Sequence, residues 1–336
     1  MNYSPVRAPK ASLAILTQAV ARWRAEGLTS AVLLGDLLDK SAQREGTVEA
    51  CLAELKAALA AAPLQYHFVF GNGDADVLGR RRWVEEQFAP SSCTPERLYY
   101  STAPTPGLRL VFLDTYEVSL NGPATADAAA LARRRLDATN PLWSREASGP
   151  LRWQEYLTRF AEGTQADALA TQPWNGQPGE AQMAWLASEL AAADASGERV
   201  FVFGHCPIHP HTCKPDGLAW NHAALRGALE AHACVQAYIA GHDHDGGYAC
   251  SAAGVHYLVP PAPLECNEES SELAFGAVRV GEAAWALEWV GKEPAPGSAT
   301  LRGGVWPRAQ PLPYRTAAMA AAGAAAGGAV GGAAAL

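Results

Sequence analysis

The chain has 336 residues, a formal net charge of −8 at pH 7 and 49% hydrophobic residues, a fraction inflated by alanine. This length fits one large domain with a sizeable core. The acidic balance argues against a nucleic-acid-binding protein, which would need a clustered basic face. It is compatible with a small phosphate-containing ligand, because a bound metal can supply positive charge locally.

The cysteines and the first residues indicate the compartment. Seven cysteines are scattered along the chain without a CxxC pair, which argues against a disulfide framework and a cysteine zinc site. The first residues, MNYSPVRAPK, lack the continuous apolar core of a secretory signal. We therefore expect a reduced, intracellular and cytoplasmic protein.

Helical and strand patterns alternate along the chain. Apolar residues at helical spacing predict a helix that begins at Ala11 and includes Trp23. In chain order there follow a strand at 31–35, a helix at 48–59, strands at 65–70 and 108–114, a helix at 179–193, and strands at 199–204 and 235–241. After Gly246 three strands follow with short connections, GVHYLV, LAFGAVRV and AAWALEWV. This order predicts a layered α/β sandwich with helices covering packed sheets.

The predicted domain spans residues 11–315, after a short N-terminal remnant at 1–10. Residues 136–180 are rich in Pro, Trp and Gly, and we expect a long insertion or loop with short helices there. Residues 316–336 are rich in Ala and Gly and nearly lack Leu, Ile and Phe. They are too weakly apolar for a membrane helix, so we expect a low-complexity flexible tail.

Polar clusters follow four of the predicted strands, each beginning with glycine. Because ligand sites of α/β sheets collect beyond the carboxyl ends of the strands, we expect these clusters to converge. They are GDLLD with Asp36 and Asp39, GNGD with Asn72 and Asp74, GHCPIHPH with His205, and GHDHDGG with His242 and His244.

Carboxylate, amide and imidazole groups without a thiolate suit Mn, Fe or Zn. A carboxylate can bridge two ions, and two metals can clamp a phosphoryl displacement. Each motif alone also has a structural interpretation: Asp36 as a helix N-cap, Asn72 as a turn residue, His205 as a satisfied strand-end histidine. Their joint occurrence after buried strands favours a metal site. The remaining histidines, His67, His222, His232 and His256, are interpreted as surface or core residues.

These motifs resemble those of the calcineurin-like metallophosphoesterase superfamily, whose pattern is D-x-H, GDxxD, GNH-[E/D], a lone His and GHxH. The resemblance covers roughly residues 11–315 and is closest to the manganese-dependent ADP-ribose/CDP-alcohol diphosphatase branch. The stretches VFLDTYEVS, WNGQPGEAQMAWL, GLAWNHAAL and AHACVQAYIAGHDHDGGY carry it.

The resemblance implies a layered α/β/β/α sandwich and a hydrolase that cleaves the phosphoanhydride of ADP-ribose or CDP-alcohols with a metal-bound hydroxide. The implied cofactor is a divalent metal, Mn above all, with Fe or Zn as alternatives, and the implied partner is a small nucleotide diphosphate. The implied roles are a bridging ligand for Asp36, completion of one metal site by Asn72, His205 and His242, a ligand of the other metal for His244, and orientation of ligands by Asp39. Cys234 falls near the branch's substrate pocket, or packs as a small hydrophobe.

Two departures accompany the resemblance. The first motif is absent from the sequence, either because the chain is truncated or because the motif is truly lost, and its absence removes two ligands of one metal and a central strand. The second departure is Gly73, where the family has a histidine beside the acidic residue that matches Asp74. General acid–base help of this kind is worth about 10²–10⁴ in rate. We therefore expect one well-preserved metal site, an incomplete second site and impaired turnover. The alternative is an inactive family member that binds a nucleotide or a metal.

Overall fold

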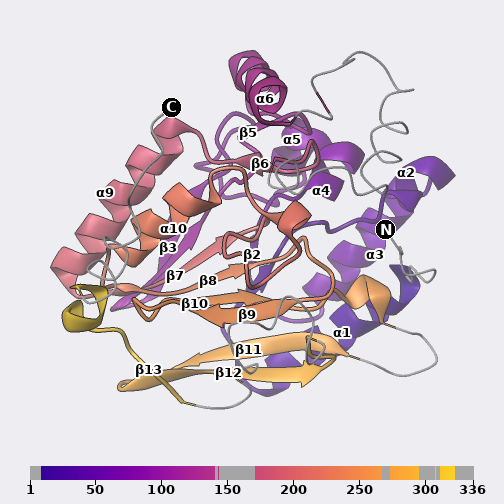
Figure 1. Cartoon of the computed structure of the whole chain (residues 1–336). Coiled ribbons are helices and arrows are strands. Elements are labelled where there is room, and N and C mark those ends of the chain that lie inside the picture. Colours follow the sequence, from indigo (N-terminus) through magenta and orange to yellow (C-terminus); the bar gives the residue numbers. More distant parts are fainter. Residues whose placement is uncertain are drawn as a thin grey trace.

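The computed structural model describes residues 9–140, 143, 171–266, 273–294, 307 and 311–321. In these residues helices and strands alternate as the sequence predicts (Figure 1). The helices are α1 (Pro9–Ala25), α2 (Ser41–Glu45), α3 (Val48–Ala60), α4 (Asn72–Val77), α5 (Gly79–Glu85), α6 (Ala126–Thr139), α9 (Glu180–Ser196) and α10 (His222–Glu230). The strands are β1 (Ser30–Leu33), β2 (Gln65–Phe68), β3 (Tyr100–Thr105), β4 (Leu108–Phe112), β5 (Val118–Ser119), β6 (Gly176–Gln177), β7 (Arg199–Gly204), β8 (Val235–Ala240), β9 (Gly247–Cys250), β10 (His256–Val259), β11 (Ala274–Val280), β12 (Ala284–Gly291) and β13 (Leu312–Pro313).

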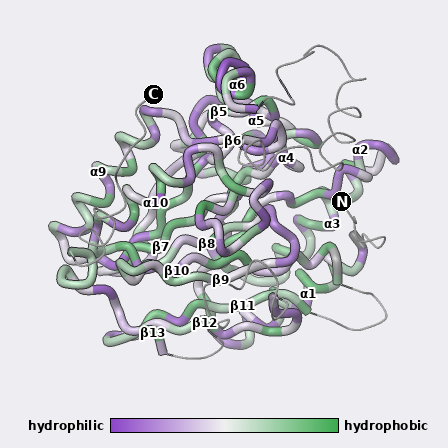
Figure 2. The backbone as a smooth tube through the Cα atoms, viewed as in Figure 1, coloured by the Kyte–Doolittle hydropathy of each residue, from purple (hydrophilic) through white to green (hydrophobic). Residues whose placement is uncertain are grey.

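A six-stranded mixed sheet forms the centre, in the order β3-β4-β7-β8-β10-β9. Its inner strands β4, β7, β8 and β10 run parallel, and the edge strands β3 and β9 are antiparallel to their neighbours. Strand β8 is buried along its whole length, and β7 and β8 are mostly green in Figure 2. Continuous apolar runs of this kind are typical of parallel strands covered on both faces.

The two faces of the central sheet are covered differently, and this gives the layers of the fold. Helices α9 and α10 lie on one side, and the β11–β12 sheet with α1 lies on the other (Figure 1). Trp285 of β12 meets Phe201 of β7 edge-on, with ring centroids 5.3 Å apart. The predicted α/β layered sandwich is confirmed by this arrangement.

Two strand edges stay open in the described part of the chain. There β1 pairs only with β2, and β11–β12–β13 form a separate three-stranded sheet. The stretch predicted as a buried strand at 31–35 is accordingly only partly buried beyond Ala31. The predicted loss of one strand of the family fold stays a prediction.

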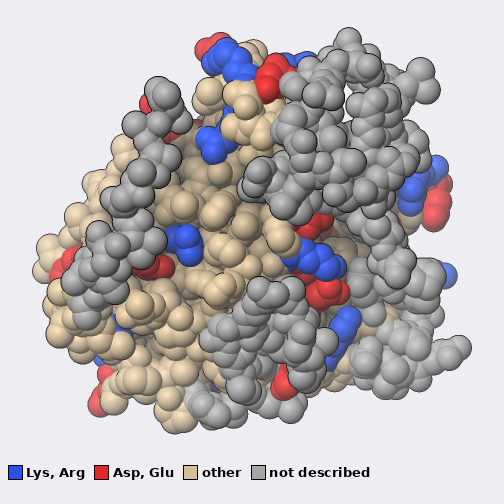
Figure 3. All heavy atoms as spheres, in the orientation of Figure 1, with Lys and Arg blue, Asp and Glu red and all other residues tan. Residues whose placement is uncertain are grey.

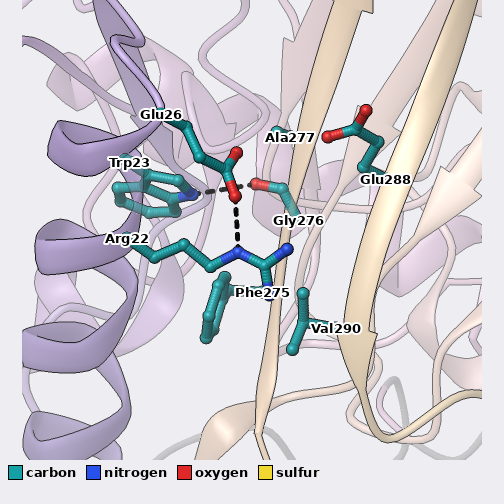
Figure 4. A pocket seen from close by; sticks show the side chains of 8 residues that line it. All are labelled: Arg22, Trp23, Glu26, Phe275, Gly276, Ala277, Glu288 and Val290. Carbon is teal, nitrogen blue, oxygen red and sulfur yellow. Dashed lines mark hydrogen bonds and ion pairs between the residues drawn. The ribbon is translucent and has the colours of Figure 1, made fainter.

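Helix α1 covers the open edge of β11. The Nε1 of Trp23 donates a hydrogen bond of 3.1 Å to the carbonyl of Gly276. Arg22 and Glu26 form an ion pair in the shallow pocket beside it (Figure 4). This pocket lies between α1 and β11, away from the strand ends that carry the polar motifs, so we assign it a structural role.

The structure adds elements that periodicity did not predict. Strands β3 and β9 and helices α4 to α6 were not expected, and Asn72 begins α4 instead of closing a strand. Helices of six or seven residues, such as α4 and α5, are too short to show a periodic signal.

On the face that Figure 3 shows, charges of both signs are interspersed among uncharged residues.

The predicted boundaries are tested only where the chain is described. The first helix begins at Pro9, two residues before its predicted start. Most of the predicted insertion and the last fifteen residues of the predicted tail lie outside the described residues. Residues 317–321 of that tail are helical, and Ala320 is buried. No helix in the described ranges is long and apolar enough to cross a membrane.

Candidate metal centre at the strand ends

Four predicted ligands come together beyond the carboxyl ends of β1, β2, β7 and β8. Oδ1 of Asp36 lies 3.6 Å from Nε2 of His205. The rings of His205 and His242 are 5.1 Å apart, and Nδ1 of His242 lies 3.1 Å from Oδ1 of Asn72. The amide of Gly73 closes the ring by donating to Oδ1 of Asp36 at 2.6 Å. Two sheets thus contribute to one polar cluster.

The backbone at this cluster is held in uncommon conformations. Asp36 and His242 have φ angles of 54° and 68°, in the left-handed region that non-glycine residues rarely adopt. Such strain persists where surrounding contacts over-determine it, and it concentrates at functional sites. A Cβ on Gly35 would lie 2.5 Å from Nδ1 of His205, and one on Gly71 would overlap the carboxylate of Asp36. The glycines that open these motifs therefore let the ligands approach closely.

Asp74 braces the strained loop that presents Asp36. It is fully buried, and its Oδ2 accepts the amides of Asp36 at 2.8 Å and Gly71 at 2.9 Å. Its Oδ1 accepts the amide of Leu37 at 2.8 Å. Burial and the charge of Asp36 raise the pKa of Asp74, against the effect of these three amides.

The structure places Asp39 and His244 beside the cluster. Oδ1 of Asp39 accepts the amide of Ser41 at 2.8 Å, a contact that supports the start of α2. The carbonyl of His244 accepts the amide of Ala262 at 3.1 Å, and the charge of His244 contributes to lowering the pKa of His242. Their predicted roles, an orienting group and a ligand of a second metal, remain predictions.

His205 is held in the tautomer that a metal ligand requires. Its Nδ1 lies 2.7 Å from the carbonyl of Leu34, which can only accept, so the proton is on Nδ1. Nε2 therefore carries a free lone pair. This Nε2 is buried, has no hydrogen-bond partner and faces Asp36. A ligating histidine typically donates its other N–H to a carbonyl or carboxylate in this way.

Asn175 fixes the tautomer of His242. Nδ2 of Asn175 donates to the carbonyls of Asp216 at 2.8 Å and Leu218 at 2.9 Å, so its Oδ1 faces His242. Oδ1 lies 2.7 Å from Nε2 of His242, which places the imidazole proton on Nε2. Burial, with the charge of His205, lowers the pKa of His242 to about 3, so the ring is neutral near pH 7. Its Nδ1 lone pair consequently faces Oδ1 of Asn72.

Asn72 is itself anchored by residues that the sequence analysis did not single out. The hydroxyl of Tyr116 donates to Oδ1 of Asn72 at 3.3 Å, and Nδ2 of Asn121 donates to its backbone carbonyl at 3.1 Å. Tyr116 and Asn175 lie in VFLDTYEVS and WNGQPGEAQMAWL, two stretches that carry the family resemblance. In the sequence, only that resemblance points to these two residues. Their roles depend on contacts between distant segments.

The residues present fit a divalent cation. Two lone pairs, on Asn72 Oδ1 and His242 Nδ1, face each other, and a third, on His205 Nε2, is buried without a partner. A cation between them would satisfy all three, with Asp36 supplying the negative charge. Within the described ranges, no three Asp, Glu, His or Cys side chains are close enough to hold an ion as they stand. A cation at this position would therefore need Asn72 as a ligand beside Asp36, His205 and His242.

Cys234 does not lie at this centre. It precedes β8, whereas His242 follows the other end of that strand, so the two are about 20 Å apart at the rise of an extended chain. Cys234 is 5% exposed, and its Sγ donates to the carbonyl of Leu190. This placement favours the alternative, a small core residue, and the role beside a substrate pocket remains a prediction.

Two of the four histidines predicted to be surface or core residues, His67 and His256, pack among aromatic rings. His67 stacks on Phe112 with centroids 4.9 Å apart. His256 meets Trp285 edge-on at 5.1 Å and lies 2.9 Å from the hydroxyl of Tyr248. Both are buried, as expected for structural histidines.

Comparisons with known proteins agree with this architecture. No family model matches the chain. It is 30% identical over 260 residues to the manganese-dependent ADP-ribose/CDP-alcohol diphosphatase of Arabidopsis thaliana, covering 76% of this chain and 78% of the relative. The protein of the same name from Danio rerio is 28% identical over 275 residues, covering 79% and 82%. The crystal structure of a dimetal phosphatase from Danio rerio superposes with a TM-score of 0.76 at 25% identity, covering 94% of this chain and 93% of that one. This chain therefore belongs to the metallophosphoesterase family that includes the manganese-dependent ADP-ribose/CDP-alcohol diphosphatases.

Proposed function

We propose that this chain hydrolyses the phosphoanhydride bond of small nucleoside diphosphate derivatives of the ADP-ribose and CDP-alcohol type, with Mn²⁺ as the native metal and Fe or Zn as alternatives. One observation carries the proposal. The buried Nε2 of His205 faces Asp36 without a hydrogen-bond partner, beside the facing lone pairs of Asn72 and His242. The names of the relatives supply the substrate class.

The chain's own residues have distinct tasks in this reaction. Asp36, Asn72, His205 and His242 would hold the cation, which activates water and neutralises charge on the phosphate when bound. The carbonyl of Leu34 and the amide of Asn175 keep the two imidazoles in the ligating tautomers. Asp74 holds the loop that presents Asp36. Gly73 contributes only its amide, which donates to Asp36.

A second cation is expected to bind more weakly. Of the ligands that the resemblance implies for it, this chain keeps Asp36 and His244. We propose one tight and one weak Mn²⁺ site. Isothermal titration of the purified chain with Mn²⁺ tests this, and two tight sites would contradict it.

A second candidate function is binding of a nucleotide or metal without turnover. The observation in its favour is position 73, where a Cβ would lie 3.0 Å from Oδ1 of Asp36. The carboxylate of Asp36 crowds the space in which the family's histidine would begin. Gly73 has no side chain, so this position supplies no general acid.

Release of AMP from ADP-ribose in the presence of Mn²⁺ decides between the two candidates. The hydrolase proposal expects a rate well above that of an Asp36→Ala control, with CDP-glycerol cleaved in parallel. A rate equal to that of the control would refute hydrolysis. Mn²⁺ binding measured on the same samples would then show whether the binding function survives.

A further inference from the structure

A second polar cluster, which the metal centre does not use, lies where α6 meets the start of α10. We call Arg135, His222 and Arg226 the cationic cluster. Arg135 is on α6, His222 is the first residue of α10, and Arg226 follows one turn later on the same helix. Nη2 of Arg135 donates to the carbonyl of Trp220 at 2.9 Å, which ties α6 to the segment before α10.

Each member of the cationic cluster has a buried nitrogen without a hydrogen-bond partner. These are Nε of Arg135, Nδ1 of His222 and Nε of Arg226. Two amide oxygens nearby, Oδ1 of Asn221 and Oε1 of Gln177, are also buried and unpaired. Buried polar groups are normally paired, and each unpaired one calls for an explanation such as an absent ligand.

Within the described residues, the two arginines of the cluster have no acidic partner. No carboxylate of a described residue forms an ion pair with Arg135 or Arg226. Burial, followed by the charges of Arg226 and Arg135, lowers the pKa of His222. Burial, with Arg226 next, lowers the pKa of His209 to about 4. Positive charges that oppose one another at a half-buried site are costly unless an anion joins them.

Arg315 shows how this chain treats a structural arginine. Its guanidinium donates to the carbonyls of Ala253, His232, Val235 and Glu230, at 2.7 to 3.0 Å. Its donors are thus used within the fold. The unpaired Nε of Arg226 and Arg135 contrasts with this pattern, so the cationic cluster is not explained as packing.

The cationic cluster borders the metal centre through residues 175–178. Asn175 contacts His242, and Gln177 follows two residues later in β6. The amide of Trp220 donates to the carbonyl of Gly176 at 2.9 Å, and Nδ2 of Asn221 donates to that of Pro178 at 3.3 Å. A substrate that spans two phosphates and a sugar could reach from one site to the other.

We propose that the cationic cluster is a subsite for the phosphate of the sugar-phosphate half of the substrate. The guanidinium groups match phosphate oxygens in shape and charge. The unpaired oxygens of Asn221 and Gln177 accept from sugar hydroxyls. The inference rests on the proposed function, since it assigns the half of the diphosphate that is not held by Asp36, Asn72, His205 and His242.

Binding of ribose 5-phosphate tests the subsite. Its affinity is measured by calorimetry on the full-length chain, with saturating Mn²⁺ and again with chelator, for the wild type, Arg226→Gln and Arg135→Gln. We expect each substitution to weaken binding about 10-fold or more, as for loss of a charged hydrogen bond, both with and without Mn²⁺. Inorganic phosphate is the second probe, and weaker binding than ribose 5-phosphate shows the contribution of the hydroxyls.

Arg134→Gln is the matched control, because Arg134 is exposed and adjoins Arg135 on α6. It should bind like the wild type. Thermal melting reports whether the variants fold: Arg226→Gln should leave the melting temperature unchanged or raise it, whereas Arg135→Gln also loses the hydrogen bond to the carbonyl of Trp220 and should melt slightly lower. Equal affinity in the wild type, Arg226→Gln and Arg135→Gln, or no binding by the wild type at millimolar concentration, would overturn the subsite. Neither result depends on turnover of ADP-ribose, so failure of the subsite is distinguishable from failure of the proposed hydrolysis.

Discussion

Two buried polar regions lie close together in this molecule, and only one of them is closed. Arg80 and Asp114 form a two-pronged ion pair at 2.6 and 3.1 Å, and both are less than 10% exposed. Nε of Arg80 donates to the carbonyl of Gly122, and Asp114 accepts the amide of Tyr116. In the neighbouring metal centre, Nε2 of His205 has no partner.

The difference separates structural from functional polarity. A buried charge pair persists when its hydrogen-bonding capacity is used within the fold. The candidate metal centre instead combines a strained backbone with buried, unpaired lone pairs, an arrangement that a ligand would complete. The cationic cluster resembles the candidate metal centre, because it has buried polar atoms without partners. Arg315 resembles Arg80, because its donors are used within the fold. The substitutions below test this division.

Filling position 73 should have the largest effect. Gly73→His adds the imidazole that the family resemblance places beside Asp74, and it should raise the rate of ADP-ribose hydrolysis by about 10²–10⁴. Asp36 must move by a few tenths of an ångström to admit the new Cβ. Gly73→Ala, which imposes the same crowding without an imidazole, is the control, and an equal effect of both variants would contradict the assignment.

Removal of one partner of the Arg80–Asp114 ion pair should lower the stability of the fold and leave the affinity for Mn²⁺ unchanged. Arg80→Leu leaves Asp114 buried without its partner, and we expect the free energy of unfolding to fall by about 3–5 kcal/mol. Denaturant titration measures this. The double variant Arg80→Leu/Asp114→Leu should recover much of the loss, whereas a loss as large as in the single variant would argue against the ion pair as the cause.

Asn175→Leu should loosen the open centre. Without the amide oxygen, His242 is free to carry its proton on Nδ1, so we expect Mn²⁺ affinity to fall about 10–100-fold. Calorimetry measures the affinity, and ¹⁵N chemical shifts report the tautomer of His242. Asn175→Asp still accepts from Nε2 and should retain more affinity. An unchanged tautomer in Asn175→Leu would remove Asn175 from this role.

The smallest expected effect is on the pH dependence of stability, through the buried His256. Burial, with the charge of Arg315, lowers the pKa of His256 to about 4, whereas an unfolded histidine titrates near 6.5. Because the folded pKa lies below the unfolded one, this stabilisation is complete above about pH 6.5 and is lost as the pH falls. Between pH 6.5 and 5 we expect a loss of about 1–2 kcal/mol from this residue. His256→Gln should flatten that part of the stability–pH curve, and an unchanged slope would contradict the assignment.

The residues that meet at the candidate metal centre were largely predictable, but the residues that orient them were not. Asp36, Asn72, His205 and His242 each follow a strand in a distinctive motif, and the carboxyl ends of strands converge by a general rule of α/β folds. Asn175 acts on His242 across 67 positions, and Tyr116 acts on Asn72 across 44. No local sequence pattern indicates such contacts. Cys234 precedes β8, at the end opposite His242, and its role beside a substrate pocket remains a prediction.

The sequence by itself determined the layered fold, the order of the principal strands and the ligand types at their ends, because hydrophobic periodicity and turn residues are local properties. Only the tertiary structure decided which lone pairs remain free, which carboxylate serves as a brace and which arginines lack a counter-charge among the described residues. These properties depend on the pairing of groups far apart in the chain. Whether a buried polar atom is satisfied is a property of its neighbours in space, and the sequence names the atom without naming those neighbours.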